Sequence, residues 1–142
     1  MRLVTVTRTI DAPIGEVWAI TSSFGTIKPW MKGIGTVSVT GAGIGAVRSI
    51  QSGFGAVHET LIHIDPENHS VRYAIGGEGL EDWAGFSGGT DLHAVSPDRT
   101  RIEWVAEADS APGDTSAMEA GLRDFMEAGI AGLARLIGAK VE

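Results

Sequence analysis

The sequence predicts a single α+β domain in which a curved antiparallel sheet of seven strands packs against one long C-terminal helix. Between residues 36 and 108, six short runs alternate apolar and polar residues and are separated by tight turns. Tight turns indicate an antiparallel meander, because parallel strands need long crossovers. After this meander, an apolar stripe with helical spacing runs from residue 116 to about residue 138. The length of 142 residues is that of one domain, so we expect residues 1–142 to form a single unit.

The N-terminal segment predicts a strand followed by two short helices. Residues 2–10 alternate apolar and polar side chains, which is typical of a strand. Pro13 suits the first turn of a helix, and Asp11 lies close enough to cap it, so a helix is expected to run to about Ser23. A second short helix is expected over residues 26–31.

The central segment predicts the six-strand meander. We expect its strands at residues 36–40, 46–51, 56–64, 70–75, 83–95 and 100–108. Alternation in the last of them places Ile102 and Trp104 on one face and Glu103 on the other, which sends Glu103 to solvent.

The C-terminal segment predicts the longest element of the chain. Ser116 followed by Glu119 fits a capping box, and Asp114 adds negative charge at the positive end of the helix dipole. The apolar stripe consists of Met118, Leu122, Phe125, Met126, Ile130, Leu133 and Ile137. We expect the helix to end near Gly138.

Composition and charge exclude several classes of function. The chain has no cysteine, so disulfides, thiol nucleophiles and cysteine-held metal centres are absent. A net charge of −7 disfavours nucleic acid and anionic membrane surfaces as partners. The apolar stretches are far shorter than the ~20 residues that span a bilayer. We therefore expect a cytoplasmic protein with no stable membrane insertion, and a homodimer is one possible state.

The sequence also offers no pattern typical of a metal or a cofactor. The four histidines form no helical ligand pair, which leaves a cross-strand cluster of His58, His63 and His93 as the one arrangement to consider. Glycine-rich loops do not join a strand to a helix in a nucleotide-binding pattern. We expect no metal and no cofactor.

Several motifs resemble the helix-grip superfamily (START-like, or SRPBCC). They are Thr9-Ile10-Asp11-Ala12-Pro13 with Val17-Trp18, Gly45-Ala46-Val47-Arg48, His58-Glu59-Thr60-Leu61 and Arg101-Ile102-Glu103-Trp104. The superfamily includes START lipid-transfer domains and the birch pollen allergen family. This chain is most similar to its bacterial polyketide cyclase/dehydrase-like branch. The resemblance implies a helix-grip fold, with the sheet wrapped around the C-terminal helix and a cavity for a small hydrophobic ligand.

A further likeness is to the plant abscisic-acid receptors. In those receptors a lysine after the second helix pairs with the ligand carboxylate, and Lys32 lies at the matching place. The segment Ser52-Gly53-Phe54-Gly55-Ala56 resembles their gate loop without its proline, and the histidine–arginine pair of their latch is missing here. Their cavity glutamate matches Glu59, and the aromatic after their latch matches Trp83. The receptor likeness would also send Glu103 into the cavity, against the alternation of its strand.

Lys32 and Glu59 are the candidate catalytic residues. Inside a cavity, Lys32 would stabilise a carboxylate or an oxyanion, and Glu59 would move a proton unless it pairs with Lys32. The alternatives are a surface lysine at a helix end and a carboxylate at the rim. The candidate ligand-binding residues are Trp30, Lys32, Phe54, Glu59, Tyr73, Leu80, Trp83, Phe125 and Gly129.

Two of these assignments have a structural alternative. The aromatic side chains serve equally well as plain core residues. Gly121, Gly129 and Gly132 in the last helix either leave volume for a ligand or let the helix approach the sheet closely. The loops at 52–56 and 76–81 would form the mouth of the cavity.

The sequence leaves three functions open. The first is binding of a small hydrophobic ligand, such as a lipid, a polyketide or an aromatic or isoprenoid-like molecule. The second is an enzyme of the cyclase, dehydratase or isomerase type that acts on such a ligand. The third is a ligand-gated sensor with an apolar docking patch around Phe54 and Leu80.

Overall fold

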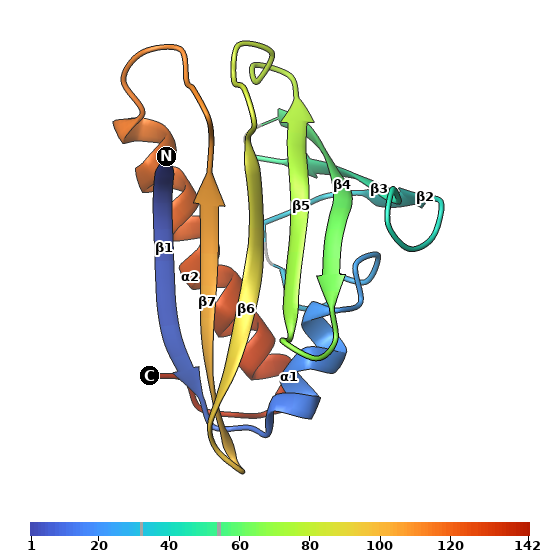
Figure 1. Ribbon diagram of the computed structural model, residues 1–142, viewed down its shortest axis with the longest axis vertical. Coiled ribbons are helices and arrows are strands. Elements are labelled where there is room, and N and C mark those ends of the chain that lie inside the picture. Colours follow the sequence, from blue (N-terminus) through green and yellow to red (C-terminus); the bar gives the residue numbers. More distant parts are fainter. Residues whose placement is uncertain (32, 54) are drawn as a thin grey trace.

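The computed structural model describes residues 1–31, 33–53 and 55–142, and this part of the chain forms one sheet and two helices. In chain order the elements are β1 (Arg2–Ile10), α1 (Ile14–Thr21), β2 (Val37–Thr40), β3 (Val47–Ser52), β4 (Gly55–Asp65), β5 (Ser70–Gly77), β6 (Ser87–Ser96), β7 (Arg99–Glu107) and α2 (Ser116–Ile137). Figure 1 shows the strands side by side in front of α2, with α1 near one end of the sheet.

The sheet is antiparallel, with its seven strands in the order β1-β7-β6-β5-β4-β3-β2. Strands β2 to β7 each pair with the next one along the chain, as short turns require. Strand β1 lies at one edge of the sheet and pairs with β7, so the first and last strands of the chain are neighbours. The predicted seven-stranded antiparallel sheet with a long C-terminal helix is confirmed.

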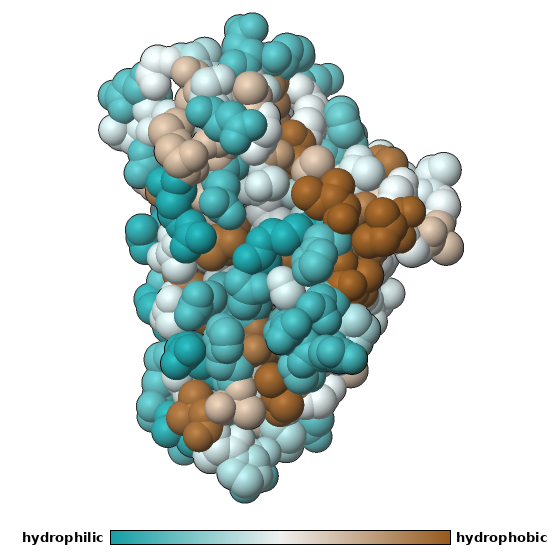
Figure 2. Space-filling model, viewed as in Figure 1, coloured by the Kyte–Doolittle hydropathy of each residue, from teal (hydrophilic) through white to brown (hydrophobic). Residues whose placement is uncertain are grey.

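The hydrophobic core lies between the inner face of the sheet and α2. Alternate residues of the strands point inward, and they meet α2 residues that are spaced three and four apart. The main cluster includes Val4, Val6, Ile102, Trp104, Met126, Ile130 and Leu133. A second cluster of Phe24, Ala46, Leu61, Val71 and Tyr73 lies under β3 to β5. The outer face of the sheet is mostly hydrophilic (Figure 2), which is the other half of the same alternation.

The fold also bears on two further expectations, namely the face on which Glu103 lies and whether a helix could span a membrane. Glu103 lies on the face opposite Ile102 and Trp104, is half-exposed, and forms an ion pair with Arg101 at 3.5 Å. Alternation therefore predicted its side correctly, and the inward placement taken from the receptors is wrong. Neither described helix is long and apolar enough to cross a membrane.

The predicted second short helix is wrong. Residues 28–30 form a turn, in which the Trp30 and Met31 N–H groups both donate to the Ile27 carbonyl, at 3.2 and 2.9 Å, and residues 26–31 contain no regular helix. Pro29 has no N–H to give and disfavours helical backbone at Lys28, the residue before it. A segment this short, with Pro29 in its middle, does not repay the cost of starting a helix.

The predicted cap of α1 by Asp11 and the predicted capping box of Ser116 and Glu119 are wrong, whereas Asp114 does lie at the start of α2. The residue before α1 is Pro13, and Asp11 instead accepts a hydrogen bond from Arg99 at 3.0 Å. At α2, Glu119 pairs with Thr115, while Asp114 accepts hydrogen bonds from the Ser116 N–H and hydroxyl. The helix therefore begins as expected at Ser116. However, Ser116 bonds to Asp114 and Glu119 bonds to Thr115, so Ser116 and Glu119 do not pair with each other.

The predicted strand over residues 83–95 begins late. Strand β6 starts at Ser87, and the segment before it makes only an isolated bridge between Ala84 and Ser110. Gly85 has a φ of 61°, a left-handed conformation that interrupts extended backbone. This irregular segment leads to Phe86, a buried residue that lines the cavity described next.

Candidate functional site

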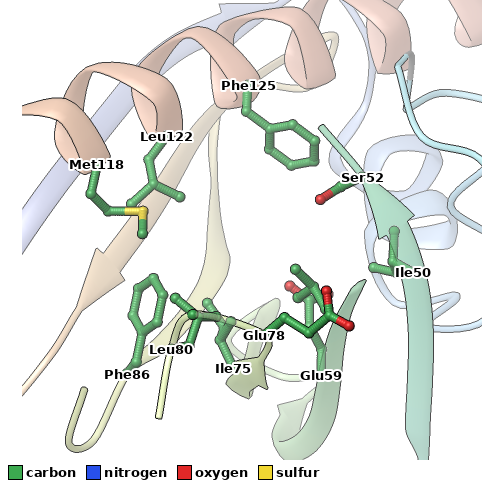
Figure 3. A pocket seen from close by; sticks show the side chains of 12 residues that line it. Ile50, Ser52, Glu59, Ile75, Glu78, Leu80, Phe86, Met118, Leu122 and Phe125 are labelled. Atoms are coloured by element: carbon green, nitrogen blue, oxygen red, sulfur yellow. The ribbon is translucent and has the colours of Figure 1, made fainter. Parts of the chain in front are cut away.

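An apolar cavity of about 230 Å³ lies between the first half of α2 and strands β3 to β5. It is lined by Ile50, Ser52, Val57, Glu59, Ile75, Glu78, Gly79, Leu80, Phe86, Met118, Leu122 and Phe125. Figure 3 shows Met118, Leu122 and Phe125 pointing from α2 toward the side chains of the strands and of the loop at Glu78 and Leu80. A cavity of about 150 Å³ lined by apolar side chains holds benzene. The space here suits a molecule of one or two rings.

The two periodicities of the chain explain which residues line this space. Met118, Leu122 and Phe125 are four and three residues apart, so they share one face of α2. Val57 and Glu59 are two residues apart on β4, so they share the inner face of the sheet. The cavity therefore forms where the helical face and the inner strand face diverge near the start of α2.

A buried ion pair between Arg48 and Glu59 lies beside the cavity. The Arg48 Nε–H donates to Glu59 Oε1 at 2.7 Å, and the two side chains are only 7% and 13% exposed. The two residues are direct cross-strand partners of β3 and β4. Arg48 shares the inner face with Ala46 and Ile50, which are also buried.

The rest of the Arg48 side chain is held as firmly. Its Nη1 donates to the Phe24 carbonyl at 2.8 Å. Its guanidinium carbon lies 4.2 Å from the centre of the Phe24 ring and 4.8 Å from that of the Tyr73 ring. Aromatic faces stabilise a cation at this range, especially where water is excluded. Arg48 thus fixes Glu59 in one position at the edge of the cavity.

The structure brings some of the predicted site residues together and separates others. Glu59, Leu80 and Phe125 line the cavity. Trp83 stacks on Phe86 at 5.0 Å between ring centres, and lines a shallow depression next to the cavity. Lys32 and Phe54 lie outside the described residues.

Trp30 and Tyr73 are buried in the core beside the site. The Trp30 ring packs on Trp104 with 5.9 Å between ring centres, and Trp104 in turn packs on Phe125 at 6.1 Å. The Trp104 Nε1–H donates to the Tyr73 hydroxyl oxygen at 3.0 Å. Burial raises the pKa of Tyr73, and the negative charge of Glu59 adds to this, so Tyr73 stays a neutral phenol.

The space under Gly129 is filled by an aromatic ring, which corrects the expectation that this glycine leaves volume. A Cβ on Gly129 would lie 2.6 Å from Trp104 Cζ3, and a Cβ on Gly132 would collide with the Trp30 carbonyl oxygen. Both glycines let α2 approach the core closely. The volume of the cavity comes instead from the first half of the helix.

Sequence reasoning missed Arg48 as a site residue, along with Met118, Leu122, Ile75 and Phe86. A signal for Arg48 was present, since it lies between the apolar Ala46 and Ile50 at alternate positions. An arginine on the inner face of a strand needs an acidic partner, and Glu59 on the next strand supplies it. The cross-strand arrangement of His58, His63 and His93 was the one metal site to consider, although the sequence predicts none. Within residues 1–31, 33–53 and 55–142, no three His, Asp or Glu side chains gather closely enough to hold a metal ion.

A curved antiparallel sheet, closed by one long helix over an apolar cavity, defines a helix-grip protein of the START-like (SRPBCC) superfamily. The profile of the family described as "Polyketide cyclase / dehydrase and lipid transport" matches residues 1–138. The chain belongs to this family. None of the curated proteins is significantly similar to it in sequence.

Solved structures share the fold at low sequence identity. A Thermobifida fusca protein has a TM-score of 0.81 at 19% identity, covering 92% of this chain and 89% of that one. Norcoclaurine synthase from Thalictrum flavum, in complex with dopamine and hydroxybenzaldehyde, has a TM-score of 0.76 at 17% identity and coverages of 94% and 87%. The Zhui aromatase/cyclase from Streptomyces sp. R1128 has a TM-score of 0.73 at 16% identity and coverages of 92% and 90%.

Proposed function

We propose that the protein binds a small, mostly hydrophobic ligand in the cavity between α2 and strands β3 to β5. The observation that carries this proposal is the cavity itself, which keeps about 230 Å³ open among apolar side chains. Apolar surface left inside a domain of this size forfeits stabilisation of about 25 cal/mol per Å² unless something covers it. A ligand that fills the cavity regains that stabilisation.

Family and fold agree with ligand binding in general. The family description joins cyclase or dehydrase activity with lipid transport, and both need a hydrophobic molecule held inside the domain. The norcoclaurine synthase structure contains two small aromatic molecules. Each has one ring, and a molecule of one or two rings is the size that this cavity suits.

A second candidate function is an enzyme of the cyclase or dehydrase type. The observation that favours it is a carboxylate, Glu59, among otherwise apolar lining residues. In that function Glu59 would exchange a proton with the bound substrate. The third candidate, a receptor-like sensor with an apolar docking patch around Phe54 and Leu80, stays a prediction, as does the homodimer.

The ligand-binding proposal is tested with naphthalene, an apolar two-ring probe. We expect the protein to bind it with one site in calorimetric or NMR titrations. Replacing Leu122 by Trp puts a larger ring into the cavity, so Leu122→Trp should weaken naphthalene binding at least about tenfold, or ~1.4 kcal/mol.

A matched control uses the same substitution on the same helix. Leu136 is 50% exposed, so Leu136→Trp should bind naphthalene as the unmodified protein does. Absence of binding to the unmodified protein, or equal binding by both tryptophan variants and the unmodified protein, would contradict the proposal. Native mass spectrometry of the purified protein would show whether a cellular molecule already occupies the cavity.

A further inference from the structure

The cavity offers its ligand a hydrogen-bond acceptor whose charge is already paired. Glu59 Oε1 accepts from Arg48 Nε at 2.7 Å, whereas Glu59 Oε2 accepts no hydrogen bond from the described residues. Glu59 is one of the lining residues, and Figure 3 shows its carboxylate among the side chains around the cavity. Because Arg48 is itself held by the Phe24 carbonyl and two rings, the carboxylate is not free to turn away.

The other described residues around the cavity add no positive charge. Its polar lining residues are Ser52, Glu59 and Glu78, and the remainder are apolar or glycine. Glu78 is exposed and lies at the mouth, next to Gly55. The electrostatic character of the described lining is therefore that of an acceptor, with a second carboxylate at the entrance.

We propose that the ligand is a neutral aromatic molecule of one or two rings that carries a hydroxyl group, and that this hydroxyl donates a hydrogen bond to Glu59 Oε2. The inference rests on the proposed function, because it names the class of ligand for the same cavity. A hydroxyl donor satisfies the open acceptor, and hydrogen bonds to charged groups are stronger than those between neutral groups.

Two other ligand classes fit these contacts poorly. A carboxylate ligand has no proton to donate to Glu59 Oε2, would lose its hydration, and would have to pass the negative charge of Glu78 at the entrance. An ammonium ligand would lose its hydration, and Arg48 has already neutralised the charge that would repay this loss. A neutral hydroxyl group costs less to desolvate than either ion.

The test compares four probes that share one ring system. They are naphthalene, 2-naphthol, 2-naphthoate and 2-naphthylmethylammonium, each titrated into the protein at pH 7. We expect 2-naphthol to bind about tenfold more tightly than naphthalene, as one charge-assisted hydrogen bond supplies. We expect the two ionic probes to bind more weakly than naphthalene.

The variant Glu59→Gln tests the role of the acceptor. A glutamine that keeps its carbonyl oxygen on Arg48 presents an N–H₂ donor to the cavity, so the tenfold preference for 2-naphthol should fall to about one. The control is Glu103→Gln, which makes the same change on the outer face and should leave the preference intact. Loss of the preference in both variants would overturn the inference.

The probe ranking separates this inference from the proposed function without any variant. If neither naphthalene nor 2-naphthol binds, the proposed function fails. If both bind equally, the cavity holds ligands but the hydroxyl contact is wrong. If 2-naphthoate binds most tightly and Lys32→Gln abolishes that binding, Lys32 captures carboxylates and the inference is overturned. Tightest binding of the ammonium probe overturns it as well.

Discussion

At the scale of single residues, the ion pair between Arg48 and Glu59 is the feature with the largest consequences. Removing a charged group from water is costly, and a buried pair repays this cost only when both partners are present and hydrogen-bonded. Here Arg48 is satisfied by Glu59, by the Phe24 carbonyl and by two aromatic faces. Loss of one partner leaves an uncompensated charge.

The variant Arg48→Met should therefore lower the free energy of unfolding by about 3–5 kcal/mol. The measurement is urea unfolding at pH 7. In the double variant Arg48→Met with Glu59→Leu no charge remains, so most of the stability should return. A loss below about 1 kcal/mol in the single variant, the median value of a surface pair, would contradict this interpretation.

Sequence reasoning reached one half of this pair. Alternation along β4 puts Glu59 on the inner face with Leu61, and the structure has it there. The one partner considered for it was Lys32, whereas the described partner is Arg48. The alternation of one strand predicts a face but not the register between two strands, and it is the β3–β4 register that joins Arg48 to Glu59.

At the scale of elements, α2 packs against the core through two glycines that have no room for a methyl group. Alanine is better than glycine in a helix by about 1 kcal/mol, so the sign of a substitution depends on the space available. Next to Gly132 the obstacle is the Trp30 backbone carbonyl, and next to Gly129 it is the Trp104 ring.

Gly132→Ala should destabilise the protein more than Gly129→Ala, because backbone yields less readily than a ring. We expect losses of about 1–3 kcal/mol from overpacking, measured by thermal or urea unfolding. The control is Gly15→Ala in α1, where nothing lies within 4 Å of an added Cβ and a small gain in stability is expected. A gain in stability from Gly132→Ala would refute the close approach of α2.

Strands β5 and β6 are also linked by side chains, because Arg72 and Ser70 on β5 donate hydrogen bonds to Asp91 on β6. Burial alone would raise the pKa of Asp91, but hydrogen bonds from Arg72 and Ser70 and the charge of Arg72 lower it below its ordinary value of 3.8. The Arg72 Nη2–H donates to Asp91 Oδ2 at 2.6 Å. The ionised form of Asp91 is thus favoured in the folded protein.

This lowered pKa fixes the sign of a pH effect. The stabilisation from ionised Asp91 is present above about pH 4, the pKa region of an unfolded aspartate, and is lost as the pH falls through the lower pKa of the folded state. Asp91→Asn should therefore reduce stability at pH 7, with a smaller reduction below pH 4. Urea unfolding across this range is the measurement, and Asp124→Asn, at an exposed position of α2, is the control. A deficit of Asp91→Asn that does not shrink in acid would contradict the assignment.

Local sequence patterns were sufficient to predict the long helix and most strands, but not the helix caps. The helix at 116–137 and most strands follow from periodicity, since the pattern extends over many residues. Caps depend on single side chains that have several acceptors within reach. Asp11 therefore bonds Arg99, 88 positions away in sequence, and not the helix beside it.

At the scale of the whole molecule, the order of strands β2 to β7 and the C-terminal helix were predictable, and the cavity was predictable only as a consequence of family resemblance. Tight turns determine an antiparallel meander, and one long amphipathic helix must cover one face of it. The position and size of the cavity depend on where side chains from α2, β3, β4 and β5 end in space. All of Leu80, Phe86, Leu122 and Phe125 line the cavity, but only Leu80 and Phe125 were predicted as ligand-binding residues.

Ligand binding in this cavity is tested most directly by intermolecular nuclear Overhauser effects between 2-naphthol and a sample labelled with ¹³C at its methyl groups. Binding as proposed predicts contacts to the methyl groups of Met118, Leu122 and Ile75, which line the cavity. Contacts to the exposed Ile44 and Ile62 in their place, or no contacts at saturating probe, would contradict it.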